Sequence, residues 1–217
     1  MFVYPQQAEF NRVVPKSKIY EHAKASKRLK QLFVDQVEEI IWKYKISPET
    51  INLPASGGID EIQVFEIRLK TADFEKDLLH AIDKAIPFPM LFRLVSEAKT
   101  CFAAAYKRPS EADSSKWVTE GLFVTPFVST SFKEQPLPVS LNLATLYEQM
   151  IRAHIPLAAR KGEGLAEQVF RFKELEAKVR AKEQLESRLS QEKQFNRKVE
   201  LNAEIRKVNE DLLLLNR

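Results

Sequence analysis

The apolar positions in the last third of the chain follow a helical spacing. Between Leu165 and Arg217 there is no proline or glycine, and most apolar residues are three or four positions apart. This spacing places side chains on one face of an α-helix, and the charged and polar residues between them suit a solvated face. We therefore predict amphipathic helices over residues 165–217. The apolar positions are Leu165, Val169, Phe172, Val179, Leu185, Leu189, Phe195, Val199, Leu201, Ile205, Val208, Leu212 and Leu215.

The phase of this apolar pattern changes along the segment. Residues Leu201 to Leu215 repeat in steps of four and three, but a ten-residue step separates Leu175 from Leu185 and Leu185 from Phe195. At about 100° per residue, each such step turns the apolar stripe by about 80°, so a simple two-stranded coiled coil is not expected. Two structures remain open: a helical hairpin that folds back near residues 190–196, or one long helix with different partners along its length. Either leaves an apolar surface that other residues must cover.

Upstream, helix-like and strand-like patterns alternate. Lys27 to Tyr44 has apolar residues at the 3.6-residue spacing with charges opposite, which predicts a helix ended by Ser47-Pro48. Glu61 to Leu69 alternates apolar and polar residues, as a half-buried strand does. Asp73 is predicted to cap a helix that runs to Ile86.

The next segments predict two more strands, a loop, a further strand and a helix. Met90 to Val95 and Thr100 to Tyr106 are apolar runs that form a predicted hairpin. We expect a polar loop at Pro109 to Ser115, a strand at Gly121 to Val128 and a helix at Ser140 to Ile155. The sum is an α+β fold with a small, mostly antiparallel sheet of about four strands covered by helices.

The length of 217 residues suits one domain plus an appendage. We expect a basic N-terminal arm over residues 1–30, the α+β domain over 31–158, a linker over 159–164 and the amphipathic helices over 165–217.

Composition narrows the class of protein. Hydrophobic residues make up 44% and charged residues 29% of the chain, which is typical of a globular protein. No apolar run approaches the length of a membrane span, and the first ten residues lack the features of a signal peptide, so we expect a cytoplasmic protein without a membrane partner. The single cysteine, Cys101, lies in an apolar run and is predicted to be a buried, inert thiol.

Positive charge is concentrated near the N-terminus. Residues 11–30 have a net charge of +6, against +4 for the whole chain. A basic segment of this kind can contact phosphates or an acidic protein surface, although it is also compatible with a solvated helix. The candidate nucleic-acid contacts are Lys16, Lys18, Lys27 and Arg28, together with Lys107 at the end of a predicted strand.

Most catalytic signatures are absent from the sequence. There is no phosphate-binding glycine loop, zinc-protease motif or nucleophile elbow, and we predict no cofactor and no metal site. The remaining enzymatic candidate is a nuclease that holds Mg²⁺ with carboxylates and uses a lysine. It would combine Glu97 and Lys99 with a second acid from Asp60 or Glu61. The Glu97-to-Lys99 tripeptide falls in the predicted hairpin turn, which does not favour this assignment. The histidines His22, His80 and His154 have no partners at metal-binding spacing.

Five strings of the sequence are long enough to compare with known families. They are RVVPKSKIYEH (Arg12 to His22), LFVDQVEEIIWKYKISPETINL (Leu32 to Leu53), EIQVFEIRLK (Glu61 to Lys70), LLHAIDKAIPFPMLFRL (Leu78 to Leu94) and EKQFNRKVELNAEIRKV (Glu192 to Val208). These strings resemble, in the same order, a family of bacterial and archaeal proteins, the domain of unknown function 4391. The resemblance covers most of the chain and implies no established activity or catalytic residues. It does imply gene neighbours that encode helicases and DNA methylases of restriction or phage-defence systems.

The leading hypothesis is a non-catalytic accessory subunit of a DNA-acting bacterial defence complex. Its α+β domain would dock on a helicase or another large subunit. The C-terminal helices would mediate assembly or association with a second copy of the chain, and the basic arm would contact DNA. Packing inside the subunit is the alternative role for the interface residues. The other hypotheses are a metal-dependent nuclease and a plain nucleic-acid-binding module. The predicted interface residues are Leu201, Ile205, Val208, Leu212 and Leu215.

Overall fold

The computed structural model describes residues 2–97, 99–110, 112–113 and 117–217. The chain forms two compact units, an N-terminal unit (Met1–His154) and a C-terminal unit (Ile155–Arg217). The strands are β1 (Phe2–Val3), β2 (Glu9–Val13), β3 (Val37–Ile46), β4 (Ile62–Leu69), β5 (Met90–Ser96), β6 (Lys99–Pro109), β7 (Trp117–Val124), β8 (Val128–Ser129) and β9 (Gln135–Pro136). The helices are η1 (Gln6–Ala8), α1 (Lys16–Ala23), α2 (Lys27–Gln36), α3 (Pro48–Ile51), α4 (Asp77–Ala85), α5 (Leu143–Arg152), α6 (Leu165–Gln191) and α7 (Phe195–Asn216).

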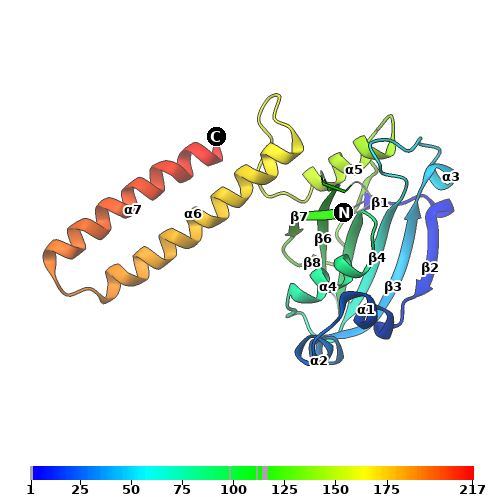
Figure 1. Ribbon diagram of the computed structural model, residues 1–217, viewed down its shortest axis with the longest axis horizontal. Helices are drawn as coiled ribbons and strands as arrows, with labels where there is room; N and C mark the ends of the chain where they lie inside the picture. Colours follow the sequence, from blue (N-terminus) through cyan, green and yellow to red (C-terminus); the bar gives the residue numbers. More distant parts are fainter. Residues whose placement is uncertain (1, 98, 111, 114–116) are drawn as a thin grey trace. The chain divides into compact units, whose positions relative to one another are not determined.

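The N-terminal unit is built on a mixed sheet (Figure 1). In the described part of the chain its order is β2-β3-β4-β5-β6-β7, with β8 paired to β6, which makes seven strands. Strands β4 and β5 are parallel and joined through α4, whereas the other neighbours on this path are antiparallel. The predicted α+β class is confirmed, and most neighbouring strands are antiparallel as predicted. The predicted size of about four strands was wrong, and the β4–β5 pair makes the sheet mixed. A parallel pair needs a crossover connection, and the predicted helix before Pro87 supplies it.

The largest local correction concerns residues 27–44, which sequence periodicity predicts as one helix. The helix α2 ends at Gln36, and β3 begins at Val37. Val37, Ile40 and Ile41 fit a helical spacing, but β-branched side chains favour a strand, and all three are buried in the sheet. Ser26 accepts a hydrogen bond from Leu29 N and so fixes the start of α2.

The other helices and strands differ from expectation mainly at their ends. Helix α4 begins at Asp77, not after Asp73, and α5 begins at Leu143, where the Asn142 side chain accepts from Thr145 N at 2.9 Å. The β5–β6 hairpin is confirmed. The predicted strand at 121–128 corresponds to β7 and the short β8, and the polar loop expected at 109–115 lies partly outside the described residues.

Hydrophobic cores lie on both faces of the sheet. One face packs against α1, α2 and α4 through Phe33, Leu79, Phe92 and their neighbours. Because side chains alternate along a strand, Val64, Leu91 and Phe102 point to the opposite face, where they line a small pocket with His154. β4 is thus buried on both faces, unlike the half-buried strand expected from its sequence.

Residues 2–30 form part of this unit. They supply β1, η1, β2, α1 and the start of α2, and β2 pairs with β3 as an outer strand of the sheet. Lys16, Lys18, Lys27 and Arg28 therefore lie on folded helices, and Arg12 lies on β2.

The C-terminal unit contains a helical hairpin (Figure 1). Helices α6 and α7 lie side by side and run in opposite directions, joined by Glu192 to Gln194. Of the two structures that the sequence left open, the hairpin is the one observed, and its turn lies within the range predicted for it.

Candidate functional site

The basic residues expected to contact nucleic acid fall into two groups. Lys18, Lys27 and Arg28 are exposed on α1 and α2. Arg28 Nη2 lies 3.0 Å from Glu75 Oε2, and Lys18 Nζ lies 3.5 Å from Glu21 Oε2. Exposed ion pairs of this kind stabilise a protein by at most about 1 kcal/mol, so a phosphate can replace the carboxylate at little cost.

Lys16 and Lys107 form the second group, whose ammonium groups bind carbonyl oxygens of the protein. Lys16 Nζ donates to Phe33 O at 3.2 Å and to Val37 O, at the end of α2. Partial burial lowers the pKa of Lys16, with the nearby Lys70 adding to the effect. A cation here stabilises the negative end of the α2 dipole.

Lys107 is buried, with 3% of its side chain exposed. Its Nζ donates to Asp83 O at 2.6 Å, Ile86 O at 2.6 Å and Phe88 O at 3.1 Å, and lies 3.0 Å from Asp83 Oδ1. Thr119 Oγ1 donates to the other carboxylate oxygen of Asp83 at 2.7 Å. Burial lowers the pKa of Lys107, and the Asp83 carboxylate opposes that shift. The solvent-facing phosphate contact predicted at Lys107 does not fit this position, because the ammonium caps the end of α4 inside the protein.

The structure does not bring the nuclease candidates together. Glu97 and Lys99 are exposed at the β5–β6 turn, where Glu97 has φ 48°. Asp60 precedes β4, whereas Glu97 follows β5, and these two strands are parallel. At about 3.3 Å per residue, the length of β5 separates Asp60 and Glu97 by roughly 20 Å. Among the residues that the structure describes, no group of three or more His, Cys, Asp or Glu side chains is placed to hold a metal ion.

A row of alternating charges crosses β3, β4 and β5 and was not predicted from the sequence. Arg68 Nη1 lies 2.8 Å from Glu39 Oε2, and Arg68 Nε lies 3.6 Å from Glu66 Oε1. Arg93 Nη1 lies 4.0 Å from Glu66 Oε2 and 3.7 Å from Glu134 Oε1. Glu66 and Arg68 are two positions apart on one strand, and that spacing was the available signal for a shared face. Because each carboxylate lies beside a guanidinium, these side chains form an ion-pair network. They are not a set of carboxylates left available to bind a metal ion.

The apolar stripe predicted as an interface lies between α6 and α7. Leu201 is 6% exposed, and Ile205, Val208, Leu212 and Leu215 are half-buried, whereas most other residues of α7 are exposed. Lys178 Nζ on α6 lies 2.6 Å from Asp211 Oδ2 on α7, beside this stripe. These five residues thus hold the hairpin together, which was the alternative role considered for them.

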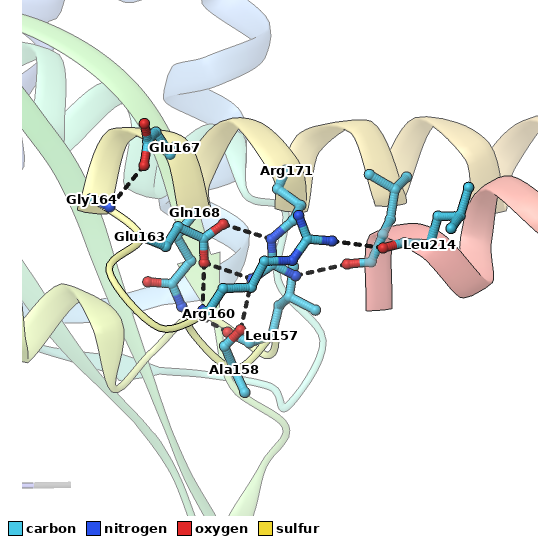
Figure 2. Close-up of polar contacts among 10 residues, drawn as sticks. Leu157, Ala158, Arg160, Glu163, Gly164, Glu167, Gln168, Arg171 and Leu214 are labelled. Carbon is cyan, nitrogen blue, oxygen red and sulfur yellow. Dashed lines mark hydrogen bonds and ion pairs between the residues drawn. The ribbon is translucent and has the colours of Figure 1, made fainter. Parts of the chain in front are cut away.

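Arg171 joins the base of the hairpin to the end of α7 (Figure 2). Its side chain is 5% exposed, and its Nε and Nη2 donate to the Glu163 carboxylate at 2.6 and 2.8 Å. The same guanidinium donates to Leu215 O and Ala158 O, each at 2.7 Å. Arg160 Nη2 donates to Leu214 O at 2.6 Å. Two arginines therefore bind the last carbonyl groups of α7, where a cation is favoured.

The ion pair with Arg171 changes the titration of Glu163. The hydrogen bonds from Arg171 lower the pKa of Glu163 to about 2, against a partial opposing effect of burial. Because the folded state binds this proton less readily than the unfolded chain, the pair stabilises the hairpin above about pH 4.5. That stabilisation is lost as pH falls from about 4.5 towards 2.

Several apolar side chains of the C-terminal unit remain exposed. Phe195 is 78% and Val199 53% exposed, and they are one helical turn apart at the start of α7. Phe170, Leu213 and Leu214 are exposed as well. Phe195 and Val199 were part of the apolar pattern of the sequence. Because the phase of that pattern changes near them, the sequence did not show that they lie outside the apolar seam between α6 and α7.

Comparison with protein families identifies the chain. The family described as Domain of unknown function (DUF4391) matches residues 2–212. The chain belongs to this family. No curated protein and no solved structure matches it. The match confirms the resemblance seen in the sequence and assigns no activity to this DUF4391 protein.

Two further sequence predictions bear on the function of this DUF4391 protein. Cys101 is buried, and burial raises the pKa of its thiol to about 12, so it stays protonated and unreactive near neutral pH. In the part of the chain that the structure describes, none of the helices has the length and apolar character that crossing a membrane requires.

His154 is the one buried histidine of the three in this DUF4391 protein. Its side chain is 4% exposed, and its Nδ1 lies 2.7 Å from Met150 O. Burial lowers the pKa of His154 to about 4, so the ring is neutral in the folded protein at neutral pH.

The low pKa of His154 predicts a loss of stability in mild acid. Between about pH 6.5 and pH 4 the unfolded chain binds a proton at His154 and the folded protein does not, so the free energy of unfolding falls as pH falls. The free energy of unfolding falls by up to about 1.4 kcal/mol for each pH unit in this range. Urea unfolding at several pH values measures it through tryptophan fluorescence, since Trp42 and Trp117 both lie in the N-terminal unit. His154→Gln should remove this slope, and an unchanged slope would assign it to another group.

Proposed function

We propose that this DUF4391 protein is a non-catalytic accessory subunit of a DNA-acting bacterial defence complex. The helical hairpin docks on a larger subunit such as a helicase, and the basic helices of the N-terminal unit contact nucleic acid. The DNA-acting partner follows from the gene neighbours that the family resemblance implies.

The observation that carries the proposal is the pair of exposed apolar side chains, Phe195 and Val199, at the turn end of the hairpin. Exposed aromatic and aliphatic groups on one helical face are typical anchors of protein interfaces. The seam of Leu201 to Leu215 is already used between α6 and α7, so the docking residues differ from those expected from the sequence. Because Phe195 is mostly exposed, it is not needed to pack α6 against α7. Its exposure therefore supports a role in binding another protein.

Nucleic-acid contact has separate support. Lys18, Lys27 and Arg28 are exposed on neighbouring helices, and the carboxylates near them form only exposed ion pairs. Charges arranged in this way neutralise phosphates and release counterions. No observation favours the nuclease hypothesis, since its candidate residues lie at opposite ends of parallel strands.

Docking through the hairpin predicts the effect of two charged substitutions. Phe195→Glu combined with Val199→Glu should weaken partner binding by at least about 30-fold, which corresponds to about 2 kcal/mol. The protein should remain folded, because both side chains are exposed. Tagged wild-type and variant proteins are purified from native cells, and the partner subunit is identified by mass spectrometry and quantified. A helicase or another DNA-acting subunit should accompany the wild-type protein alone.

Asn196→Glu is the matched control, because Asn196 is exposed on the same turn and is polar already. It should recover as much partner as the wild type. Equal recovery by the doubly charged variant would contradict docking through Phe195 and Val199. A wild-type protein that brings down no DNA-acting subunit would contradict the assignment to a defence complex.

A further inference from the structure

Two pockets flank helix α4 and share two of their lining residues. The first is lined by Ser26 and Arg28 near the start of α2, and the second by Trp117 at the start of β7. His80 and Lys84 line both pockets, so these side chains form a ridge between them. The volumes are about 340 and 570 Å³. Both lie in the range of about 300–1,000 Å³ that is common for ligand sites.

Basic side chains lie on the ridge and in the first pocket, and Asp83 of the second pocket is paired with Lys107. Lys84 and Arg28 line the pockets, with Arg28 also 3.0 Å from the exposed Glu75. The exposed Lys24 and Lys27 are the sequence neighbours of Ala23 and Arg28, which line the first pocket. Asp77 is the acidic residue that lines the first pocket. The Lys84 ammonium on the ridge and the Arg28 guanidinium in the first recess suit a phosphate backbone that crosses the ridge with its bases on either side.

Trp117 gives the second pocket a large aromatic surface. It is half-exposed and lies opposite Pro109 in the β6–β7 pairing, on a strand rather than on a free loop. Stacking of a base on such a ring contributes about 1–3 kcal/mol and tolerates any base. The bases of a duplex are stacked on one another, so a ring in a pocket reaches only an unpaired base.

We propose that the ridge of α4 binds an unpaired nucleic-acid segment, with a base stacked on Trp117 and the adjoining phosphates held by Lys84 and Arg28. This inference rests on the nucleic-acid contact in the proposed function and names the form of nucleic acid recognised. Lys107, on the floor of the second pocket, takes no part, because its ammonium group binds Asp83 and three carbonyl oxygens.

Fluorescence anisotropy with the full-length protein tests the proposal. The probes are labelled single-stranded oligothymidylate and oligouridylate and a DNA duplex of the same length. The wild-type protein should bind at least one single strand about 10-fold more tightly than the duplex. Trp117→Ala should weaken single-strand binding about 10-fold, whereas Trp117→Phe should keep most of it. Lys84→Glu should weaken binding and lower its dependence on salt.

Val118→Ala is the matched control, since Val118 is the exposed neighbour of Trp117 on the same strand. It should bind like the wild type, and circular dichroism checks that every variant is folded. Equal binding of duplex and single strand, or unchanged binding by Trp117→Ala, would overturn the inference. If duplex binding is instead lost in Lys18→Glu combined with Lys27→Glu, the inference fails while the proposed nucleic-acid contact stands. Binding of no nucleic acid at all would overturn both.

Discussion

Replacing Lys107 with methionine is expected to destabilise the N-terminal unit by about 3–5 kcal/mol. The substitution keeps most of the side-chain volume and removes the charge. It leaves Asp83, which is 3% exposed, without its counter-ion. It also removes the donor to the carbonyl groups of Asp83, Ile86 and Phe88 at the end of α4. A buried charge without a partner costs more than the ion pair itself contributes.

Urea unfolding followed by tryptophan fluorescence measures this change, because both tryptophans lie in the N-terminal unit. Lys99→Met is the control: Lys99 is exposed on the same strand, and its loss should change stability by less than about 0.5 kcal/mol. The double variant Lys107→Met with Asp83→Leu should be less destabilised than the sum of the two single variants, since it removes the buried charge as well. If Lys107→Met lowers the free energy of unfolding by less than about 1 kcal/mol, the Lys107–Asp83 ion pair is not needed to end α4.

The sequence predicted the elements whose pattern is local and unambiguous. The β5–β6 hairpin, β4 and the helical character of residues 165–217 were predicted because short-range spacing decides them. The phase change in the apolar pattern indicated either one long helix or a hairpin that turns near residues 190–196. The observed turn at Glu192 to Gln194 selects the hairpin. Such features require no knowledge of distant contacts.

The elements that were missed depend on neighbours far away in the chain. Val37 to Tyr44 satisfies helical and strand patterns alike, and pairing with β4 decides in favour of the strand. The parallel pairing of β4 with β5 was not predicted either. The predicted order of strand, helix and strand permits it, but the packing of α4 on the sheet decides it. The size of the sheet follows from these pairings and not from any single segment.

The candidate site shows the same limit. Sequence placed Lys107 among the candidate phosphate contacts because it closes a predicted strand, with a solvent-facing charge as the alternative. Only the position of α4 makes it an internal cap. Conversely, Trp117 and Lys84 are 33 residues apart and become neighbours only where β7 and α4 line one pocket. The exposure of Phe195 likewise required the inner seam of the hairpin to be known.

Replacing Arg171 with alanine is expected to release the end of α7 from the base of the hairpin. The change leaves Glu163 without its ion-pair partner and removes the donor to Leu215 O and Ala158 O. Loss of such a buried pair costs about 3 kcal/mol. Hydrogen exchange measured by mass spectrometry should therefore show faster exchange along the last turns of α7, with little change in the N-terminal unit.

Arg180→Ala is the matched control, because Arg180 is an exposed arginine on the same helix, and its exchange pattern should equal that of the wild type. Arg171→Lys should restore the structure only in part, since one ammonium group cannot reproduce a planar guanidinium that binds a carboxylate and two carbonyl groups.

The pH dependence of hydrogen exchange provides an independent check on the Arg171–Glu163 ion pair. Because the pKa of Glu163 is about 2 in the folded protein, exchange in α7 should rise as pH falls from about 4.5 towards 2 in the wild type, after correction for intrinsic exchange rates. Arg171→Ala should already exchange quickly above pH 4.5 and lack this step. Identical exchange in the variant and the wild type would mean that the apolar seam alone holds α7 on α6.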